Sequence, residues 1–304
     1  MLAAIACHGQ ATIRVWGSPQ MSGVMRLWEQ GFQKHHPEID FHDELHGTAS
    51  GIAGLYTGVA DLALMGREIW PAETLAFQTV FPWKPVEIEV ATGSYDIPKS
   101  TYALVIYVHK SNPLTKLTLD QVAAAFGSKA RTWGDLGIGG EWAGKAIHLY
   151  NFDYDNDKAL FFRRRVLQDG YRWDSATKEF ANQTNARGET IDSGQLILDA
   201  LARDPLGLAV SNPHYANRDV KALALDGVTA SVETVRSRAY PLTRAVYIYL
   251  NRDPKQPLDS KVGDFLSYIL SAEGQQDVAR EATYLPLTQE VIAAQLRQLG
   301  VAVR

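Results

Sequence analysis

A turn of small polar residues follows the strand-like run over residues 39–45. It contains Thr48, Ala49 and Ser50, and it opens a short helix. Backbone N–H groups at the start of a helix have no intrahelical partner, so small residues there let an anion approach them. The two hydroxyls add donors, and Arg67, after the next strand-like run, adds a permanent planar cation. The turn is well suited to an anion, but taken alone the stretch favours an ordinary capped helix with Arg67 at the surface.

A second turn of this kind lies closer to the N-terminus. Ser18 follows the apolar run over residues 12–16 and precedes Pro19, which suits the first position of a helix. Apolar residues then recur at helical spacing and predict one buried face: Met21, Val24, Met25, Trp28 and Phe32. Two such turns, each after a strand, indicate a crevice at the carboxyl ends of a sheet, where α/β folds bind ligands.

Composition excludes several classes of protein. The 304 residues are 46% apolar and 21% charged, with a formal net charge of −4, which argues against a general nucleic-acid binder. The sequence contains no run of about 18 apolar residues, so it predicts no membrane span. The sequence has no Gly-x-Ser-x-Gly elbow, no Walker loop and no His-Glu-x-x-His helix, so we expect neither an enzyme nor a bound cofactor.

Two groups of residues have types that bind metals. His42, Glu44 and His46 alternate along a strand-like run and so share one face, and imidazole with carboxylate suits zinc or copper. Aspartates at every second position of residues 153–157 have the opening spacing of a calcium loop, but its glycine and terminal glutamate are missing. An exposed polar strand and a helix cap are the favoured explanations of these residues, and we assign no metal site.

Strand-like and helix-like segments alternate through most of the chain, which predicts an α/β fold with mixed, mostly parallel sheets flanked by helices. Several segments together resemble the periplasmic phosphate-binding proteins of ABC transporters. The segments that carry the resemblance stand in the family's order: Gly17-Ser18, Gly47-Thr48-Ala49-Ser50-Gly51-Ile52, GVADLALMGR over 58–67, Asn112-Pro113-Leu114, Thr132-Trp133-Gly134-Asp135-Leu136, Tyr240-Pro241-Leu242, LSAEGQ over 270–275 and Tyr284-Leu285-Pro286-Leu287.

The resemblance implies a two-lobed type II periplasmic-binding-protein (Venus-flytrap) fold. Lobe one would comprise residues 9–101 and 243–304, and lobe two residues 102–242. Residues 1–8 would be the remnant of an export signal or a disordered start. In this family the ligand binds between the lobes, hinge closure buries it, and a membrane permease recognises the closed form.

The single cysteine, Cys7, follows small and apolar residues, as in the tail of a lipoprotein signal. With one cysteine no disulfide can form within the chain. Together with the resemblance, this predicts a periplasmic or exported protein, with lipid anchoring through Cys7 as an open alternative. The resemblance also implies a monomer that works with an ABC permease.

The resemblance assigns the lobe-one contacts to Ser18, Thr48, Ala49, Ser50 and Arg67. The family usually has a serine before this arginine, and here Gly66 stands there. Helix N-termini and these side chains would hold the oxygens of a small oxyanion.

Lobe two departs from the family's pattern. The family has an arginine and a Ser-Gly-Thr turn before a helix with two phenylalanines; this chain keeps Phe161-Phe162 but has NFDYDND over residues 151–157. Asn151, Asp155 and Asn156 are then the expected contributors. Carboxylates facing the ligand would repel phosphate, whereas Asp and Asn there also suit a helix cap. We expect capping by at least one of them.

The leading hypothesis is an exported solute-binding protein that binds phosphate or another small oxyanion for an ABC-type importer. The alternative is a solute-binding fold with an altered site, acting as a sensor or a protein-interaction module.

Overall fold

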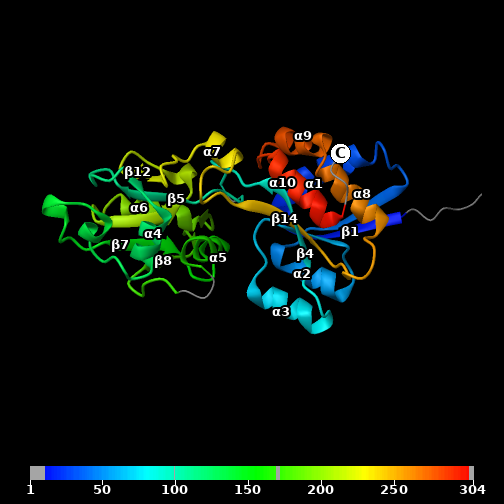
Figure 1. Cartoon of the computed structure of the whole chain (residues 1–304), viewed down its shortest axis with the longest axis horizontal. Helices are drawn as coiled ribbons and strands as arrows, with labels where there is room; N and C mark the ends of the chain where they lie inside the picture. Colours follow the sequence, from blue (N-terminus) through cyan, green and yellow to red (C-terminus); the bar gives the residue numbers. More distant parts are fainter. Residues whose placement is uncertain (1–10, 99, 169–171, 301–304) are drawn as a thin grey trace, which may run out of the picture. The chain divides into compact units, whose positions relative to one another are not determined.

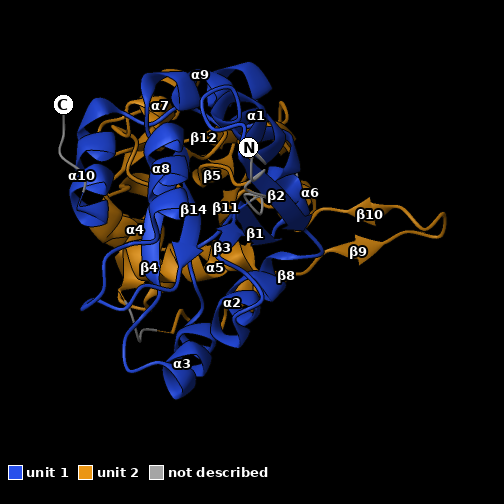
Figure 2. Ribbon diagram, turned by 90° about the vertical axis from the view of Figure 1, so that its right-hand side faces the viewer, with its two compact units in different colours: residues 1–91, 245–304 blue, residues 92–244 orange. Residues whose placement is uncertain are grey.

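The computed structural model describes residues 11–98, 100–168 and 172–300. The chain forms two compact units, which Figure 2 draws in two colours. Unit 1 comprises residues 1–91 and 245–304, and unit 2 comprises residues 92–244. Helices and mixed sheets build both units, so the expected α/β fold class is confirmed.

Unit 1 is built on a five-stranded sheet with the strand order β2-β1-β3-β14-β4. Figure 1 labels β1, β4 and β14 of this sheet. Strand β1 runs parallel to β2 and β3, and β14 runs antiparallel to β3. The strands are β1 (Ala11–Gly17), β2 (Ile39–Glu44), β3 (Leu62–Met65), β4 (Val86–Thr92) and β14 (Ala245–Leu250). The helices are α1 (Ser22–Phe32), which follows a 3-10 turn at Pro19–Met21, α2 (Thr48–Thr57), α3 (Pro71–Val80), α8 (Ser260–Ile269), α9 (Ala272–Glu281) and α10 (Gln289–Leu299).

Helices cover both faces of this sheet. Leu62 and Leu64 of β3 lie in one apolar cluster with α1, α8, α9 and α10, whereas Ala63 and Met65 lie in another with α2 and α3. Successive side chains of a strand point to opposite faces, so a strand buried at every position needs cover on both sides. The predicted face of the first helix is confirmed, since all five of its apolar residues are buried.

Unit 2 has a second five-stranded sheet with the order β12-β5-β11-β7-β8. Strand β7 is parallel to β8 and β11, and β5 is antiparallel to β11 and β12. Its strands are β5 (Val105–His109), β7 (His148–Phe152), β8 (Lys178–Phe180), β11 (Gly207–Ser211) and β12 (Val220–Ala222), and the short pairs are β6 (Lys116–Leu117) with β13 (Ala224–Leu225) and β9 (Gln183–Thr184) with β10 (Thr190–Ile191). Its helices are α4 (Leu119–Phe126), α5 (Asp157–Phe162), continued as a π-helix over Arg163–Leu167, α6 (Ser193–Leu201) and α7 (Val232–Arg236), with 3-10 turns at Trp133–Leu136, Gly140–Trp142 and Pro213–Tyr215.

The hairpin of β9 and β10 stands away from the sheet of its unit (Figure 2). Its tip, from Asn185 to Glu189, is almost entirely exposed. At its base the Ser193 backbone N–H donates to Asn182 Oδ1 at 2.8 Å, which ties the hairpin to the start of α6.

The unit boundaries differ from the expected lobe boundaries. Residues 92–101 and 243–244 were expected in lobe one, and they belong to unit 2. The reason is local pairing: the Gly93 N–H donates to the Arg244 carbonyl at 2.9 Å, and Ser94 forms a β-bridge with Tyr102. The expected export remnant at residues 1–8, with Cys7, lies outside the described residues.

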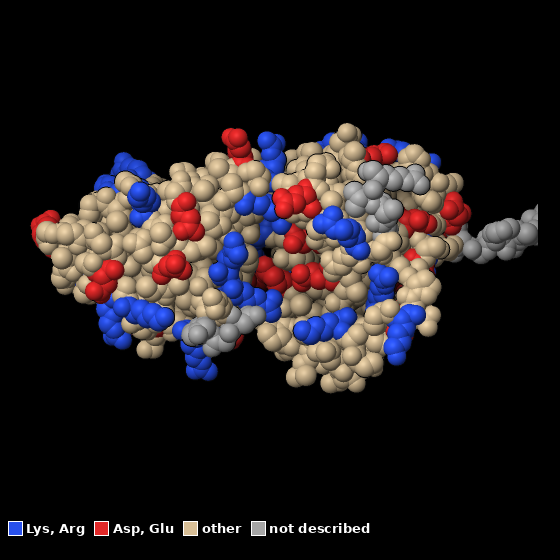
Figure 3. All heavy atoms as spheres, in the orientation of Figure 1, with Lys and Arg blue, Asp and Glu red and all other residues tan. Residues whose placement is uncertain are grey.

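Charge is mixed on the face drawn in Figure 3, where basic and acidic side chains alternate over short distances. No helix within residues 11–98, 100–168 and 172–300 is long and apolar enough to cross a membrane.

Candidate functional site

The first predicted turn lies where β1 ends. Gly17 has φ +139°, and a Cβ built there would lie 2.1 Å from the Leu64 carbonyl oxygen, so only glycine fits this close approach. The Ser18 N–H donates to the same carbonyl at 2.9 Å. The Ser18 hydroxyl is 2.5 Å from Gln20 Oε1, to which it donates, and the residue is buried. Close backbone packing thus holds Ser18 at the carboxyl edge of the unit 1 sheet.

The second predicted turn opens α2 at the same edge. Thr48 is the first residue of α2 and is half-buried, and Ala49 is exposed. The Ser50 hydroxyl donates to the Gly47 carbonyl at 2.7 Å, so its hydrogen already has a partner within the turn. The αL residue Gly58 ends α2, with φ +75°.

Arg67, the predicted cation of unit 1, forms an ion pair with the carboxylate of Glu73. Arg67 donates from Nη1 and Nη2 to the two carboxylate oxygens of Glu73, at 2.8 and 2.6 Å, and from Nη1 to the Glu68 carbonyl at 2.9 Å. Its guanidinium carbon also lies 5.7 Å from the centroid of the Trp70 ring. Glu73 accepts the Trp70 backbone N–H at 2.8 Å as well, so one carboxylate caps α3 and binds Arg67.

In unit 2, the predicted residues lie between the end of β7 and the start of α5. Asn156 caps α5, because its Oδ1 accepts the Lys158 N–H at 3.0 Å; the expected cap is confirmed. Asp155 is exposed. Asn151 is fully buried; its Oδ1 accepts the Phe152 N–H at 2.9 Å, and its Nδ2 has no hydrogen-bond partner among the described residues.

An arginine that the sequence did not single out lies beside these residues. Arg244 Nη2 donates to Asp157 Oδ2 at 2.9 Å, and Lys158 Nζ lies 3.1 Å from Asp157 Oδ1. The Arg244 side chain has no exposed surface, whereas the Asp157 side chain is 27% exposed. Burial by itself would raise the pKa of Asp157, but Lys158 and Arg244 together hold that pKa well below its usual value. Asp157 is therefore an ionised carboxylate held by two cations.

Three further buried polar atoms of unit 2 have no hydrogen-bond partner among the described residues: Tyr102 Oη, Ser193 Oγ and Asn212 Nδ2. Ser193 is the first residue of α6, and Asn212 directly follows β11. Strand β5, which Tyr102 precedes, begins at Val105, opposite Ser211 at the end of β11. Burial raises the pKa of the Tyr102 phenol, and the nearby carboxylates of Asp192 and Asp157 raise it further. These atoms therefore belong to the edge of the sheet that also carries Asn151 and Asp157.

Each of these residues carried only a weak signal in the sequence. Ser193 lies in an Asp-Ser-Gly helix start, and Asn212 precedes a proline after a strand, which are ordinary capping and turn patterns. Tyr102 lies in a β-rich run of the sequence, but β5 begins only at Val105. The approach of Arg244 to Asp157 joins positions 87 residues apart, so local pattern could not show it.

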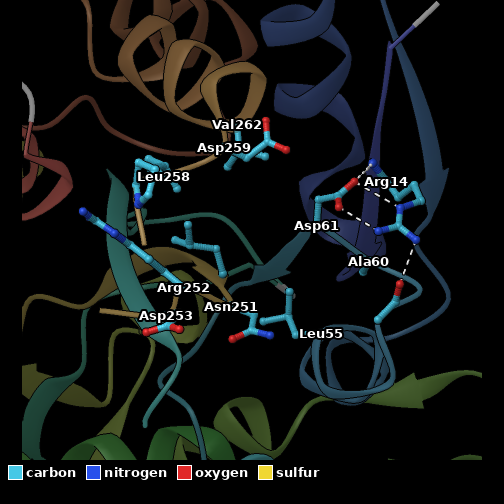
Figure 4. A pocket seen from close by; sticks show the side chains of 13 residues that line it. Arg14, Leu55, Ala60, Asp61, Asn251, Arg252, Asp253, Leu258, Asp259 and Val262 are labelled. Carbon is cyan, nitrogen blue, oxygen red and sulfur yellow. Dashed lines mark hydrogen bonds and ion pairs between the residues drawn. The ribbon is translucent and has the colours of Figure 1, made fainter. Parts of the chain in front are cut away.

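A separate pocket of about 330 Å³ lies in unit 1 (Figure 4). Its lining includes Arg14, Asp61, Arg252 and Asp253 but none of the predicted ligand residues. Arg14 and Asp61 form an ion pair at 2.7 Å within it. Since Asp61 precedes β3, this pocket lies at the amino end of β3, away from the edge that carries Ser18 and Arg67.

Of the three alternating residues, His42 and Glu44 lie in β2, whereas His46 follows the end of that strand. His42 Nε2 and His46 Nε2 lie 3.2 and 2.5 Å from the two carboxylate oxygens of Glu44. Both imidazoles are exposed. In the described part of the chain, no group of three or more His, Cys, Asp or Glu side chains could hold a metal ion.

Comparison with known proteins places this geometry in a family. Residues 3–273 match a family model described as the PBP superfamily domain. The phosphate-binding protein PstS of Pseudomonas aeruginosa (strain PAO1) is 29% identical over 299 residues, which cover 94% of this chain and 86% of that protein.

Two solved structures share the fold. PstS from Borrelia burgdorferi has a TM-score of 0.60 at 17% identity, with 92% of this chain and 100% of that chain covered. A phosphate ABC transporter substrate-binding protein from Clostridium perfringens, solved with bound phosphate, has a TM-score of 0.52 at 20% identity, with 91% and 100% covered. The expected resemblance is confirmed, and because the family model covers most of its length, this chain belongs to the PBP superfamily.

Proposed function

We propose that this protein is a solute-binding protein of an ABC-type importer and that its ligand is phosphate or another small oxyanion. The observation that carries the proposal is the set of buried donors in unit 2. Asn151 Nδ2 and Asn212 Nδ2 can only donate, and the hydroxyls of Tyr102 and Ser193 can donate. A buried donor without a partner costs about 1–3 kcal/mol. Such a group of donors suits a ligand made of oxygen acceptors. The relative from Pseudomonas aeruginosa, named for phosphate binding, supports the same ligand.

In unit 1 we assign the ligand contacts to Ser18, Thr48, Ala49, Ser50 and Arg67. Backbone N–H groups at the start of α2 and the Thr48 hydroxyl would donate to the anion, and Arg67 would supply charge. The capped and paired states of Ser50 and Arg67 mean that these two side chains must share or exchange their present partners when they bind.

In unit 2 we keep Asn151 as a direct contact, through its Nδ2. Asp155 and Asn156 remain proposed contributors from the same loop, although Asn156 Oδ1 already accepts the Lys158 N–H in the helix cap. To these we add Ser193 and Asn212, because Ser193 Oγ and Asn212 Nδ2 have no hydrogen-bond partner among the described residues.

Calorimetric titration with phosphate tests the unit 1 assignment. We expect Thr48→Ala and Arg67→Ala each to weaken phosphate binding by tenfold or more, about 1.4 kcal/mol. The matched controls are Thr57→Ala, an exposed threonine near the end of the same helix, and Arg26→Ala, an exposed arginine on α1; both should bind as the unchanged protein does. Unchanged affinity in both site variants would refute the assignment.

We further propose that the protein acts outside the cytoplasm, as a monomer, without catalytic activity and without a nucleic-acid partner, and that its macromolecular partner is an ABC permease. Anchoring through a lipid on Cys7 is a finer proposal. Mass spectrometry of the protein from the membrane fraction would detect a lipid on Cys7. Loss of the protein from that fraction in Cys7→Ser would support the anchored form, and an unchanged distribution would support the released form.

A second candidate function, a sensor or protein-interaction module, is favoured by one observation. Both candidate cations, Arg67 and Arg244, are already paired with carboxylates of the chain. Thermal unfolding with phosphate, sulfate, molybdate, phosphonates, divalent metals and small sugars separates the two functions. A ligand at a hundredfold excess over its Kd adds about 2.7 kcal/mol to the free energy of unfolding. No shift with any of them favours the second candidate.

A further inference from the structure

The Asp157 carboxylate occupies a position in unit 2 that has the properties of an anion site. Its two oxygens contact two cations, Arg244 Nη2 at 2.9 Å and Lys158 Nζ at 3.1 Å. The ammonium of Lys158 also lies 5.4 Å from the centroid of the Tyr102 ring, which places that phenol next to the pair. Two cations thus face the single carboxylate of Asp157.

More hydrogen-bond donors lie at this edge of the sheet than the two oxygens of the Asp157 carboxylate contact. A carboxylate has two oxygens, and each oxygen of Asp157 already has a cation. The amide nitrogens of Asn151 and Asn212 and the hydroxyls of Tyr102 and Ser193 are buried at the same edge of the sheet without partners among the described residues. A tetrahedral oxyanion offers four oxygens and can accept from more of these donors than a carboxylate can.

The two side chains of the ion pair differ in exposure, which indicates which of them a ligand from solvent would displace. Arg244 is completely buried, whereas 27% of the Asp157 side chain is exposed. Solvent therefore reaches the carboxylate of Asp157 but not the guanidinium of Arg244. It is also the first residue of α5, so its side chain can leave the pair by rotation while its backbone stays in the helix.

We propose that Asp157 is a built-in competitor of the ligand in unit 2: it neutralises Arg244 until a tetrahedral oxyanion displaces it. The inference rests on the proposed function, because it concerns the same ligand. It makes the carboxylate a regulator of affinity, since each binding event must separate Asp157 from Arg244. The consequence is weaker binding and faster release than the donors alone would give.

Calorimetric titration of the full chain with inorganic phosphate and with sulfate tests the proposal on Asp157→Asn. The amide keeps the shape of the side chain and removes the competing charge, so we expect the Kd for phosphate to fall by tenfold or more. Asp155→Asn is the matched control, because it removes the same charge from an exposed position of the same loop. Its Kd should stay within about twofold of the unchanged protein, as screened surface charges contribute little.

The outcomes separate this inference from the proposed function. If the unchanged protein binds phosphate and Asp157→Asn binds it equally or more weakly, the inference is wrong and the function stands. If only Asp157→Asn binds, the competitor is supported and the unchanged chain is not a phosphate carrier. If neither binds, both are refuted.

Removing a member of a buried ion pair can prevent folding, so circular dichroism accompanies each titration. If Asp157→Asn does not fold, Asp157→Ser takes its place. The readout then is the rise of the unfolding midpoint on adding phosphate, measured against sodium chloride of equal ionic strength. A larger rise in the variant than in the unchanged protein supports displacement, and an equal or smaller rise overturns it.

Discussion

The two units treat their arginines differently, although both pair them with a carboxylate. In unit 1, Arg67 makes two hydrogen bonds to Glu73, and both side chains keep some exposure, 11% and 18%. In unit 2, Arg244 donates from Nη2 to Asp157 and has no exposed surface at all. Water solvates the first pair in part, so its net contribution to stability is small, whereas the second depends on its partner. An arginine near a ligand site is therefore not automatically a free cation.

Two partly buried carboxyl groups, one in each unit, also differ: the pKa of one is raised and the pKa of the other is lowered. In unit 1, burial raises the pKa of Glu29 to about 8, and the neighbouring charge of Asp43 raises it further. In unit 2, Asp157 is also partly buried, but two cations hold its pKa low. One unit thus neutralises a carboxyl with a proton and the other with an arginine and a lysine. The difference teaches that burial alone does not set the charge of a side chain; its partners do.

The strongest test of the comparison is to remove each arginine. We expect Arg244→Met to lower the free energy of unfolding by about 3 kcal/mol, because the carboxylate of Asp157 loses the partner that compensated its burial. Arg67→Met should cost only about 1 kcal/mol, because its pair is partly solvated. Urea unfolding followed by tryptophan fluorescence measures both. Equal losses would show that the two pairs do not differ in the way the burial indicates.

A pH profile of stability sharpens the contrast between the carboxyls. Glu29 has its pKa raised to about 8 in the folded chain, so its protonated form stabilises the fold, and that contribution is lost as the pH rises through 8. We expect Glu29→Gln, which is neutral at every pH, to raise the unfolding midpoint at pH 9 by about 2–4 °C, the shift that about 1 kcal/mol produces in domains of this size. At pH 4 the variant and the unchanged protein should coincide. A constant difference at both pH values would contradict the raised pKa.

The smallest expected effect concerns Glu73. In Glu73→Gln the carboxylate opposite Arg67 becomes neutral, and the side-chain oxygen can still accept the Trp70 N–H that caps α3. A partly exposed pair contributes about 0.2–1 kcal/mol, so phosphate affinity should rise by only about 1.4- to 5-fold, less than for Asp157→Asn. Calorimetric titration of the two variants side by side makes the measurement. A larger rise in phosphate affinity from Glu73→Gln than from Asp157→Asn would show that the carboxylate of unit 1, not that of unit 2, limits binding more.

Local sequence signals account for several helix ends. The capping box of Thr118 and Gln121 is present, with bonds of 2.8 and 3.1 Å, because it depends on residues three positions apart. Gly58 and Gly300 end their helices in the αL conformation, as a residue without Cβ favours. The resemblance supplied the fold class and the family, and both are confirmed. These features are either local or spread over the whole chain.

The site was harder to predict because it depends on long-range side-chain contacts. The pairing of Arg67 with Glu73 follows from how the chain turns into α3, and nothing in the spacing of the two residues indicates it. Arg244 reaches Asp157 across 87 positions, so it needed the assembled unit. The sequence did show that the family's arginine was missing at residues 151–157. It could not show that the guanidinium of Arg244, the last residue of unit 2, contacts Asp157.

The hairpin of β9 and β10 gives the molecule a place where the chain can be opened. Its tip from Asn185 to Glu189 contacts little besides itself, so a reporter domain inserted there would leave both apolar cores intact. Its base nevertheless holds the backbone of Ser193 at the start of α6. A fluorescent insertion would therefore be mechanically linked to a residue of the proposed ligand edge, which makes this hairpin a natural position for an optical sensor.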